Sequence, residues 1–178
     1  MINSPDLCRF AAAAPHDLAD ITALAHATWP AAYGDILAPE QISWMLAEQY
    51  NAEQLQADMA AGIAFVYALL DTRRIGFFAY GPTDNPHEAL LHKIYLLPEF
   101  QSQGIGSAML QEARRRCRCA GFTSLCLYVN QHNQRAIRAY QRNGFQIARS
   151  EVFEIGQGFV REDYLMCASL TVTCGSSV

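Results

Sequence analysis

Two apolar runs joined by a glycine turn constrain the fold of this chain more than any other feature. Residues 89–97 and residues 124–129 are almost continuously apolar, which is typical of strands that are covered on both faces. Between them, residues 104–120 carry apolar side chains at helical spacing and are followed by Gly121. A strand, a helix and a strand in this order predict a right-handed parallel crossover.

The rest of the chain predicts an α/β domain with a mixed sheet. A helix that opens at residue 15 is expected to end at Trp29-Pro30, because proline interrupts helices, and a loop should follow over residues 31–38. Further helices are expected at residues 39–49, 52–61 and 134–143. Further strands are expected at residues 8–14, 64–70, 75–80, 145–153 and 164–170.

Length and composition indicate a single globular domain. We expect residues 1–178 to form one domain with a core at about residues 7–170 and a flexible tail at 171–178. A hydrophobic fraction of 51% and a charged fraction of 17% exclude a disordered chain. The net charge of −4 disfavours a nucleic-acid partner, which would usually meet a basic surface. No apolar run is long enough to span a membrane, and the first residues do not resemble a signal peptide, so we expect a cytoplasmic protein.

The six cysteines are scattered and do not form a metal-binding pattern. Cys117 and Cys119 lie in a helical pattern, and no second Cys or His pair follows at zinc spacing. We therefore expect reduced, mostly buried thiols and no metal.

The glycine turn Gln101-Ser102-Gln103-Gly104-Ile105-Gly106 has the features of an anion site. It leads into a helix, whose first N–H groups lack partners and whose dipole favours negative charge. A phosphate-binding P-loop is excluded because no lysine follows, and a dinucleotide fingerprint is excluded because Met109 stands where its third glycine belongs. The turn therefore fits a pyrophosphate in another context, or serves only as a tight connection that needs glycine.

Two motifs together resemble the GNAT family of acetyl-CoA-dependent N-acetyltransferases. Gln101, Gly104 and Gly106 match the family's pyrophosphate motif Q/R-x-x-G-x-G/A. Further along, the chain is similar to the family's N-x-x-A-x-x-x-Y-x-x-x-G-F motif, through Asn133, Ala136, Tyr140, Gly144 and Phe145. The resemblance implies the GNAT fold, a largely antiparallel mixed sheet with helices on both faces, whose parallel pair (residues 89–97 and 124–129) splays apart to admit pantetheine.

The resemblance also implies which residues bind acetyl-CoA. Backbone groups of Tyr95 and Leu96 are expected to contact the acetyl group and pantetheine, with an N–H near Leu96 as the oxyanion donor. The pyrophosphate is expected to meet the turn, at Gln101, Gln103, Gly104, Ile105, Gly106 and Ser107. Arg135, Arg138 or Arg142, or some of the run of arginines at 114–118, could meet the 3′-phosphate, although a solvated helix face is the favoured interpretation of the run.

Asn133 and Tyr140 lie seven residues apart, which places them on one side of a helix. In the family, the tyrosine at this position donates a proton to the departing CoA thiolate, and a phenol is able to do so. Asn133 is expected to contact pantetheine. The structural alternatives are a tyrosine that only packs and an asparagine that only caps its helix.

The general base is less specified. Strict alternation would put Glu88, Leu90, His92, Ile94 and Leu96 on one strand face, and His92 is the candidate because it titrates near neutral pH. A hydrogen-bonded histidine without a catalytic part, Glu88 acting through water, or ordered water alone remain open.

The acceptor side is expected to come from the N-terminal helices. Residues 29–34 are the candidate wall, with Trp29 and Tyr33 as its binding side chains and ordinary apolar packing as the alternative. Asp35, Glu40, Glu48 and Asp58 could attract a cation. The predicted function is direct transfer of acetyl from acetyl-CoA to a primary amine of a small molecule or peptide. A non-catalytic acyl-CoA-binding sensor module is the alternative. The oligomeric state stays open, with a homodimer as one arrangement.

Overall fold

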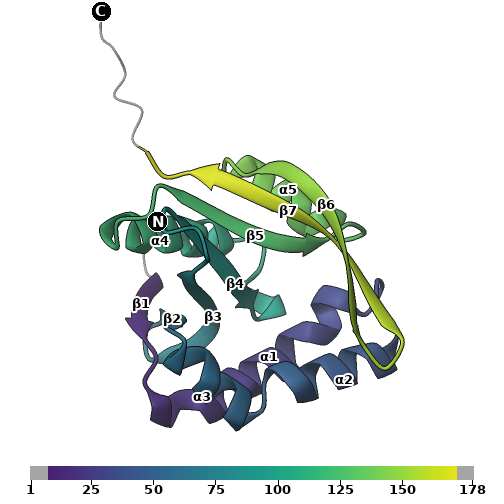
Figure 1. The fold of residues 1–178 in the computed structure, drawn as a ribbon. Helices are drawn as coiled ribbons and strands as arrows, with labels where there is room; N and C mark the ends of the chain where they lie inside the picture. Colours follow the sequence, from purple (N-terminus) through teal and green to yellow (C-terminus); the bar gives the residue numbers. More distant parts are fainter. Residues whose placement is uncertain (1–7, 172–178) are drawn as a thin grey trace, which may run out of the picture.

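A computed structural model describes residues 8–171 and shows one seven-stranded sheet with helices on both faces (Figure 1). The α-helices are α1 (Leu18–Tyr33), α2 (Pro39–Gln49), α3 (Ala52–Ala60), α4 (Ile105–Cys119) and α5 (Gln134–Arg142), and the short 3-10 turns are η2 (Pro15–Asp17) and η3 (Pro98–Phe100). The strands are β1 (Cys8–Ala12), β2 (Ala64–Leu70), β3 (Arg73–Pro82), β4 (Glu88–Leu96), β5 (Ser124–Asn130), β6 (Gln146–Gly156) and β7 (Phe159–Ser169).

The sheet has the order β1-β2-β3-β4-β5-β7-β6, and all neighbours are antiparallel except β4 and β5. The predicted β-α-β crossover over β4, α4 and β5 is confirmed. The parallel ladder between β4 and β5 is short: it begins at Glu88↔Ser124 and ends at Leu91↔Leu127. Beyond this point β4 still pairs with β3 and β5 still pairs with β7, so the sheet opens between β4 and β5.

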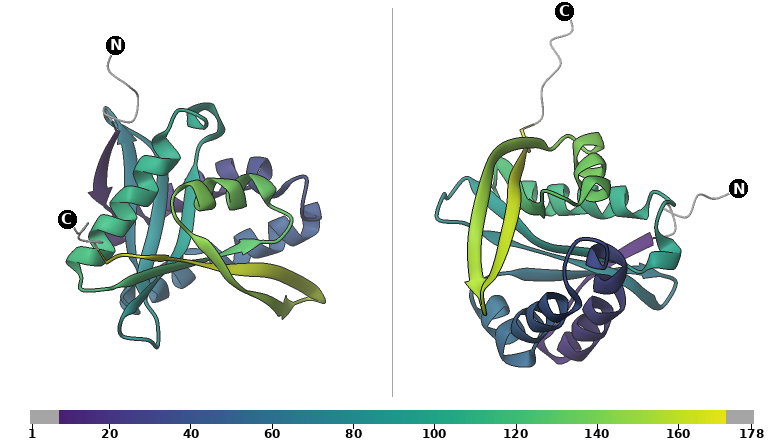
Figure 2. Two further views of the ribbon diagram at one scale, coloured as in Figure 1. Left: turned by 90° about the horizontal axis from the view of Figure 1, so that it is seen from above. Right: turned by 90° about the vertical axis from the view of Figure 1, so that its right-hand side faces the viewer.

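Two hydrophobic clusters hold the helices on opposite faces of the sheet. One contains Phe78, Met109, Leu127 and Ile137 and lies under α4 and α5, and the other contains Trp29, Leu46, Leu55 and Phe77 and lies over α1, α2 and α3. The adjacent residues Phe77 and Phe78 belong to different clusters because successive strand side chains point to opposite faces. The two views in Figure 2 separate the two helical layers.

Helix α1 continues through Pro30 to Tyr33, so the expected end at Trp29-Pro30 is wrong. A proline removes only its own N–H bond and restricts the turn before it. The carbonyl of Pro30 still accepts, from the N–H of Gly34 at 2.9 Å, and Trp29 is buried in the core. Packing therefore outweighs the lost bond, and Tyr33 is a helical residue rather than a loop residue.

Strands β6 and β7 are longer than expected and form one hairpin of two 11-residue strands. They turn at Gln157-Gly158, where both residues have positive φ (53° and 75°), as hairpin turns of this length require. The tip of the hairpin reaches α2 (Figure 1), where the rings of Phe159 and Trp44 lie 5.8 Å apart. Residues 154–156 and 159–163 thus belong to strands, and the prediction omits them because a half-exposed hairpin alternates polar and apolar side chains instead of forming an apolar run.

A β-bulge in β4 overturns the expected alternation around His92. The register with β3 shifts between Ala79↔Lys93 and Tyr80↔Leu91, so His92 is the extra residue. As a result, Leu91 and Ile94 both face the cluster under α4 and α5, whereas Tyr95 faces the cluster over α1. The bulge therefore breaks the strict alternation that was expected to put His92 on the same strand face as Ile94 and Leu96.

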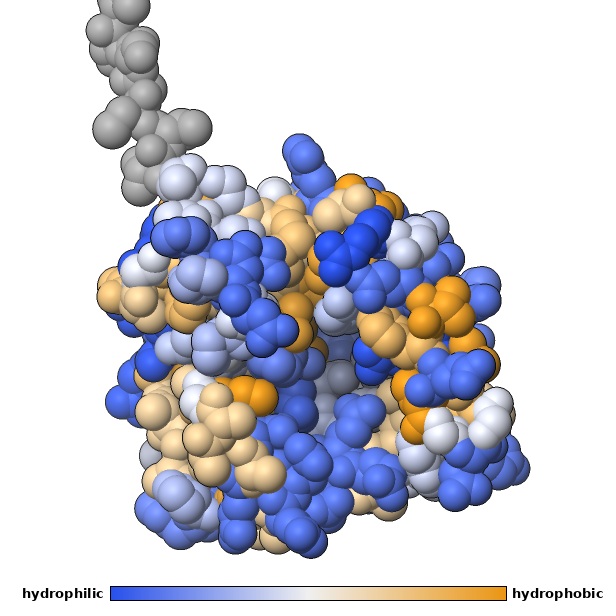
Figure 3. Space-filling model, viewed as in Figure 1, coloured by the Kyte–Doolittle hydropathy of each residue, from blue (hydrophilic) through white to orange (hydrophobic). Residues whose placement is uncertain are grey.

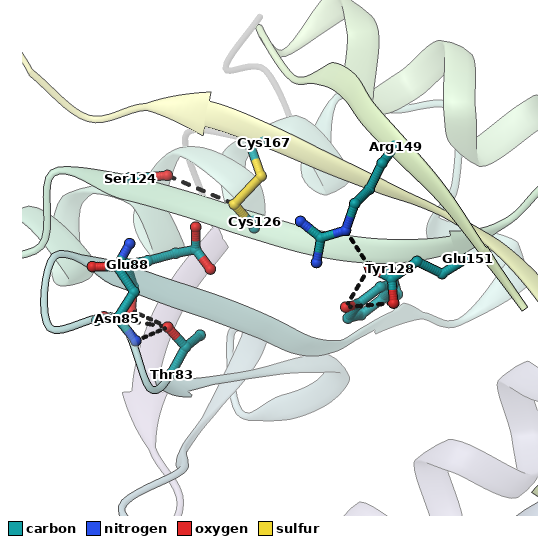
Figure 4. Close-up of a disulfide and its surroundings, with 9 residues drawn as sticks. All are labelled: Thr83, Asn85, Glu88, Ser124, Cys126, Tyr128, Arg149, Glu151 and Cys167. Carbon is teal, nitrogen blue, oxygen red and sulfur yellow. Dashed lines mark hydrogen bonds and ion pairs between the residues drawn. A yellow bond between two sulfur atoms is a disulfide. The ribbon is translucent and has the colours of Figure 1, made fainter. Parts of the chain in front are cut away.

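The expectation of reduced cysteines is wrong for one pair. Cys126 on β5 and Cys167 on β7 are direct register partners and form a disulfide, with Cα atoms 4.0 Å apart (Figure 4). They lie 41 residues apart in the sequence, so only the pairing of β5 with β7 brings them together. Within residues 8–171, Cys8, Cys117 and Cys119 are free thiols, and Cys117 is buried as expected.

The expected flexible tail lies outside the described residues, apart from Thr171. Among residues 8–171, no helix is both long and apolar enough to cross a membrane.

Candidate active site

A cavity of about 430 Å³ opens between the two helical layers, at the place where β4 and β5 part. Its lining comes from α1, the end of β4, the glycine turn, α4 and α5. Figure 3 shows a hollow in the molecular surface between β5 and β7 on one side and α1 on the other, and much of its rim is hydrophilic. Of the predicted site residues, this cavity is lined by Tyr33, Tyr95, Leu96, Gln101, Gly104, Gly106, Ser107, Asn133 and Tyr140.

The glycine turn forms one end of the cavity with its backbone. Gly104 caps α4 in the left-handed region, at φ +82°, which a side chain would strain. The first bond of the helical ladder runs from the Ala108 N–H to the Gly104 carbonyl, so the N–H groups of residues 104–107 precede that ladder. A Cβ built on Gly106 would meet no protein atom within 4 Å, although Gly106 lines the cavity. The open cradle beside free N–H groups fits a pyrophosphate.

Side chains brace this turn from within the protein. Gln101 donates from Nε2 to the Leu96 carbonyl at 2.9 Å, and its Oε1 accepts from Arg135 at 2.5 Å. Gln103 points elsewhere and donates to the Glu99 carbonyl, so it does not line the cavity, and Ile105 is a fully buried core residue. Gln103 and Ile105 can therefore offer the cavity backbone groups only.

Helix α5 brings Asn133 and Tyr140 to the other wall. The Asn133 side chain accepts from the Ala136 N–H at 3.1 Å, so it caps α5 as well as lining the cavity. The ring of Tyr140 packs against Phe145, with ring centroids 6.0 Å apart. Burial raises the pKa of the Tyr140 hydroxyl, and the nearby Tyr33 raises it further. Tyr140 is therefore a protonated phenol at neutral pH.

An aromatic cluster of Trp29, Tyr33, Tyr50 and Tyr95 forms the α1 side of the site. The hydroxyls of Tyr33 and Tyr95 lie 3.2 Å apart, and the rings of Trp29 and Tyr33 are 4.7 Å apart. Burial raises the pKa of Tyr33 and raises that of Tyr95 well above its usual value. Trp29 is 2% exposed and lies behind Tyr33 and Tyr95 rather than in the cavity wall. It supports the wall that the sequence predicts it to form.

His92 lies outside the cavity lining, beside Lys93 on β4. His92 is exposed on the strand, but the surrounding protein removes part of the water around its imidazole, and this desolvation together with Lys93 lowers the pKa of His92, while the charge of Asp58 opposes the shift. Asp58 itself is paired with Lys93 at 3.1 Å, so it is not a free anion for a substrate. His92 is thus a neutral imidazole at pH 7 and stays a prediction as the base.

The cavity also contains residues that the sequence analysis named only as alternatives or missed. Arg135 and Arg142 line it from α5, seven residues apart on one helix face, whereas Arg138 does not. The arginine run on α4 is used inside the protein: Arg114 donates to the Asn143 carbonyl, and Arg115 and Arg116 pair with Glu112. Ala31 and Ala32 of α1 line the cavity as part of the predicted acceptor wall, whereas Thr28 was missed because it carries no motif and lies inside the expected helix.

One group of potential metal ligands lies away from the cavity lining. Among the described residues, Glu88 lies near the sulfur atoms of Cys126 and Cys167 (Figure 4). Disulfide sulfurs are not thiolates, so this trio does not offer a metal the ligands that cysteine usually supplies.

Comparison with known proteins shows which family this chain resembles. The chain matches the acetyltransferase (GNAT) family over residues 18–145. It is 28% identical over 151 residues to a spermidine N(1)-acetyltransferase of Thermoplasma acidophilum, covering 82% of this chain and 90% of that one. It is 30% identical over 155 residues to an uncharacterised N-acetyltransferase of Mycobacterium bovis, covering 86% and 98%.

Solved structures show the same fold. The PaiA N-acetyltransferase of Thermoplasma acidophilum, crystallised with coenzyme A, superposes with a TM-score of 0.76 at 24% identity, over 91% of this chain and 98% of that one. A GCN5-related N-acetyltransferase of Rhodopseudomonas palustris gives a TM-score of 0.77 at 16% identity, over 95% and 98%. With its glycine cradle, its open β4–β5 pair and this family match, the chain belongs to the GNAT family of acetyltransferases.

Proposed function

We propose that this acetyltransferase moves the acetyl group of acetyl-CoA directly to a primary amine of a small molecule, with both substrates bound at once. The observation that carries the proposal is that one cavity joins the glycine cradle, the free edge of β4 and the hydroxyls of Tyr33 and Tyr140. The relative named as a spermidine N(1)-acetyltransferase supports a small aliphatic amine as the acceptor.

Each region of the cavity matches one physical need of the reaction. The N–H groups at residues 104–107 offer a site for the pyrophosphate, and Arg135 and Arg142 supply positive charge beside it. The opened edge of β4 offers unpaired backbone groups along which pantetheine can lie like an added strand. At the end of that edge, an N–H near Leu96 is proposed to bind the carbonyl oxygen as negative charge develops.

Tyr140 is proposed to protonate the departing thiolate. The reaction transfers the acetyl carbon from sulfur to nitrogen, leaves the electron pair on sulfur, and requires one proton there. A thiol has a pKa of about 8.5 and an ordinary phenol about 10, so Tyr140 is the weaker acid and transfer to a free thiolate is uphill. Burial raises the Tyr140 pKa and adds to this cost, so we propose that the proton moves as the carbon–sulfur bond breaks and that Tyr140 regains a proton from the one the amine releases.

His92 is proposed to take the proton from the amine through water. Its lowered pKa leaves the imidazole neutral and able to accept a proton at pH 7. Its place outside the cavity lining requires at least one water molecule between imidazole and substrate.

A thiol-release assay with acetyl-CoA and an amine panel tests the proposal. The panel contains polyamines, amino acids, aminoglycosides and peptides with free N-termini. We expect turnover with aliphatic di- and polyamines above that with peptides. Turnover confined to peptides would contradict the small-molecule assignment, and acetyl-CoA binding without turnover on any amine would favour an acyl-CoA-binding module.

A further inference from the structure

A buried carboxylate on β7, that of Asp163, lacks part of its hydrogen bonding, and Asp163 is not itself among the residues that line the cavity. Asp163 is 3% exposed. Its Oδ2 lies 2.7 Å from Nε of Arg161, whereas its Oδ1 is buried and has no hydrogen-bond partner among residues 8–171. A buried acceptor without a partner is unfavourable, and charged groups pay the highest cost. Such an atom indicates a partner that the described residues do not supply.

The neighbouring strand provides a contrast. Glu151 of β6 is the direct register partner of Asp163. Its carboxylate is paired with Arg149 and accepts from the Tyr128 hydroxyl at 3.3 Å (Figure 4). Two acidic side chains therefore lie opposite each other on one hairpin, and the one with fewer partners is the more buried.

The sheet register places Asp163 near the reacting end of the cavity. Asp163 is the partner of Asn130 on β5, three residues beyond the last β4–β5 pair, Leu91↔Leu127. Counting three register positions along β4, past the bulge at His92, reaches Tyr95, so Asp163 lies roughly level with the free edge that ends at Leu96. From this side the Asp163 charge acts on Tyr33, whose pKa is raised first by burial and further by that charge. Tyr33 lines the cavity.

We propose that Asp163 binds the ammonium group of the acceptor, with its Oδ1 accepting a hydrogen bond from an ammonium N–H. This inference rests on the proposed function and deepens it, because it names a cationic aliphatic amine as the substrate class and one residue that selects it. Arg161 forms an ion pair with the other carboxylate oxygen, although its Nε makes no hydrogen bond among the described residues. A neutral acceptor would leave Oδ1 buried and unpaired, which gives the site selectivity for cations.

Calorimetric titration of spermidine into the enzyme saturated with CoA tests the assignment without turnover. In Asp163→Asn we expect the spermidine Kd, and the KM in the coupled assay, to rise about tenfold to a hundredfold, the loss typical of a charge-assisted hydrogen bond. The acetyl-CoA Kd should stay within about twofold, because the glycine cradle is untouched.

Glu151→Gln is the matched control, since it removes the charge opposite Asp163 from a carboxylate that already has partners. Its spermidine Kd should change little. An equal loss in both variants would overturn the inference in favour of a diffuse negative field. An unchanged Kd in a folded Asp163→Asn would overturn it outright while leaving the proposed function intact.

Two further outcomes are distinguishable. If Asp163→Asn does not bind acetyl-CoA, the fold is damaged, and Asp163→Glu decides: retained spermidine binding supports the inference, and lost binding in a variant that still binds acetyl-CoA contradicts it. If the parent enzyme neither binds nor acetylates any amine, the proposed function fails first.

Discussion

The two sides of the cavity are built in different ways. On the coenzyme side, the groups that would meet the pyrophosphate are backbone N–H groups of one contiguous turn, residues 101–107, at the start of α4. On the acceptor side, the groups are side chains far apart in sequence: Tyr33 on α1 and Tyr95 on β4 line the cavity, and Asp163 on β7 is proposed to join them. The first side depends on local geometry, and the second depends on long-range packing. Substitutions should separate the two.

The largest effect is expected at Tyr140, where both sides meet. Tyr140→Phe keeps the ring and its contact with Phe145 and removes only the proton. We expect kcat to fall at least about tenfold and up to about 10⁴-fold, with little change in KM for either substrate, because acid catalysis acts in the transition state. Steady-state and single-turnover rates measure this. Parental turnover under conditions where chemistry limits would reduce Tyr140 to a packing residue.

A substitution at Gly106 should weaken coenzyme binding without affecting the acceptor side. A Cβ there meets no protein atom, so Gly106→Val should fold normally and place its methyl groups in the cradle. We expect the acetyl-CoA Kd to rise more than tenfold, about 1.4 kcal/mol, while spermidine KM at saturating acetyl-CoA stays unchanged. Gly106→Ala should give a smaller loss in the same direction. Unaltered coenzyme affinity in folded Gly106→Val would remove the cradle from the site.

A smaller effect is expected on the acceptor side at His92. In His92→Gln the proton acceptor is lost but water remains, so kcat/KM for the amine should fall by less than about tenfold at pH 7. The parent should lose activity as pH falls through the His92 pKa, because the protonated imidazole cannot accept a proton, and this acidic limb should flatten in the variant. Identical pH profiles would exclude His92 as the base and leave ordered water.

The disulfide should affect turnover least of all. Replacing Cys126 and Cys167 together by alanine is expected to leave kcat unchanged, since neither residue lines the cavity. The melting temperature should fall by roughly 4–16 °C, because a disulfide typically contributes about 2–4 kcal/mol and each kcal/mol is worth about 2–4 °C in a domain of this size. Six reactive thiols in denatured, unreduced parent protein would show that the pair is reduced.

The same contrast explains what the sequence predicts. The crossover, the glycine turn and the Asn133–Tyr140 helix are local patterns with fixed spacing, and they are found where expected. The predicted lengths of helix α1 and of strands β6 and β7 were too short, because tertiary packing, not local propensity, sets the ends of these elements. The bulge at His92 breaks period two, and nothing local announces it. No sequence motif marks Asp163, because the feature that singles it out, an unpaired buried oxygen, exists only in the folded structure.

The short β4–β5 ladder has a consequence for the exchange of backbone hydrogens. Where the two strands part, amides of β4 that point toward β5 have no strand partner, although they lie in the centre of a seven-stranded sheet. Their hydrogens should exchange with deuterated solvent faster than those of β2 or β3, which are paired on both edges. A molecule lying along that edge would slow them selectively. The middle of this sheet, normally its slowest region, would thus report directly on occupancy.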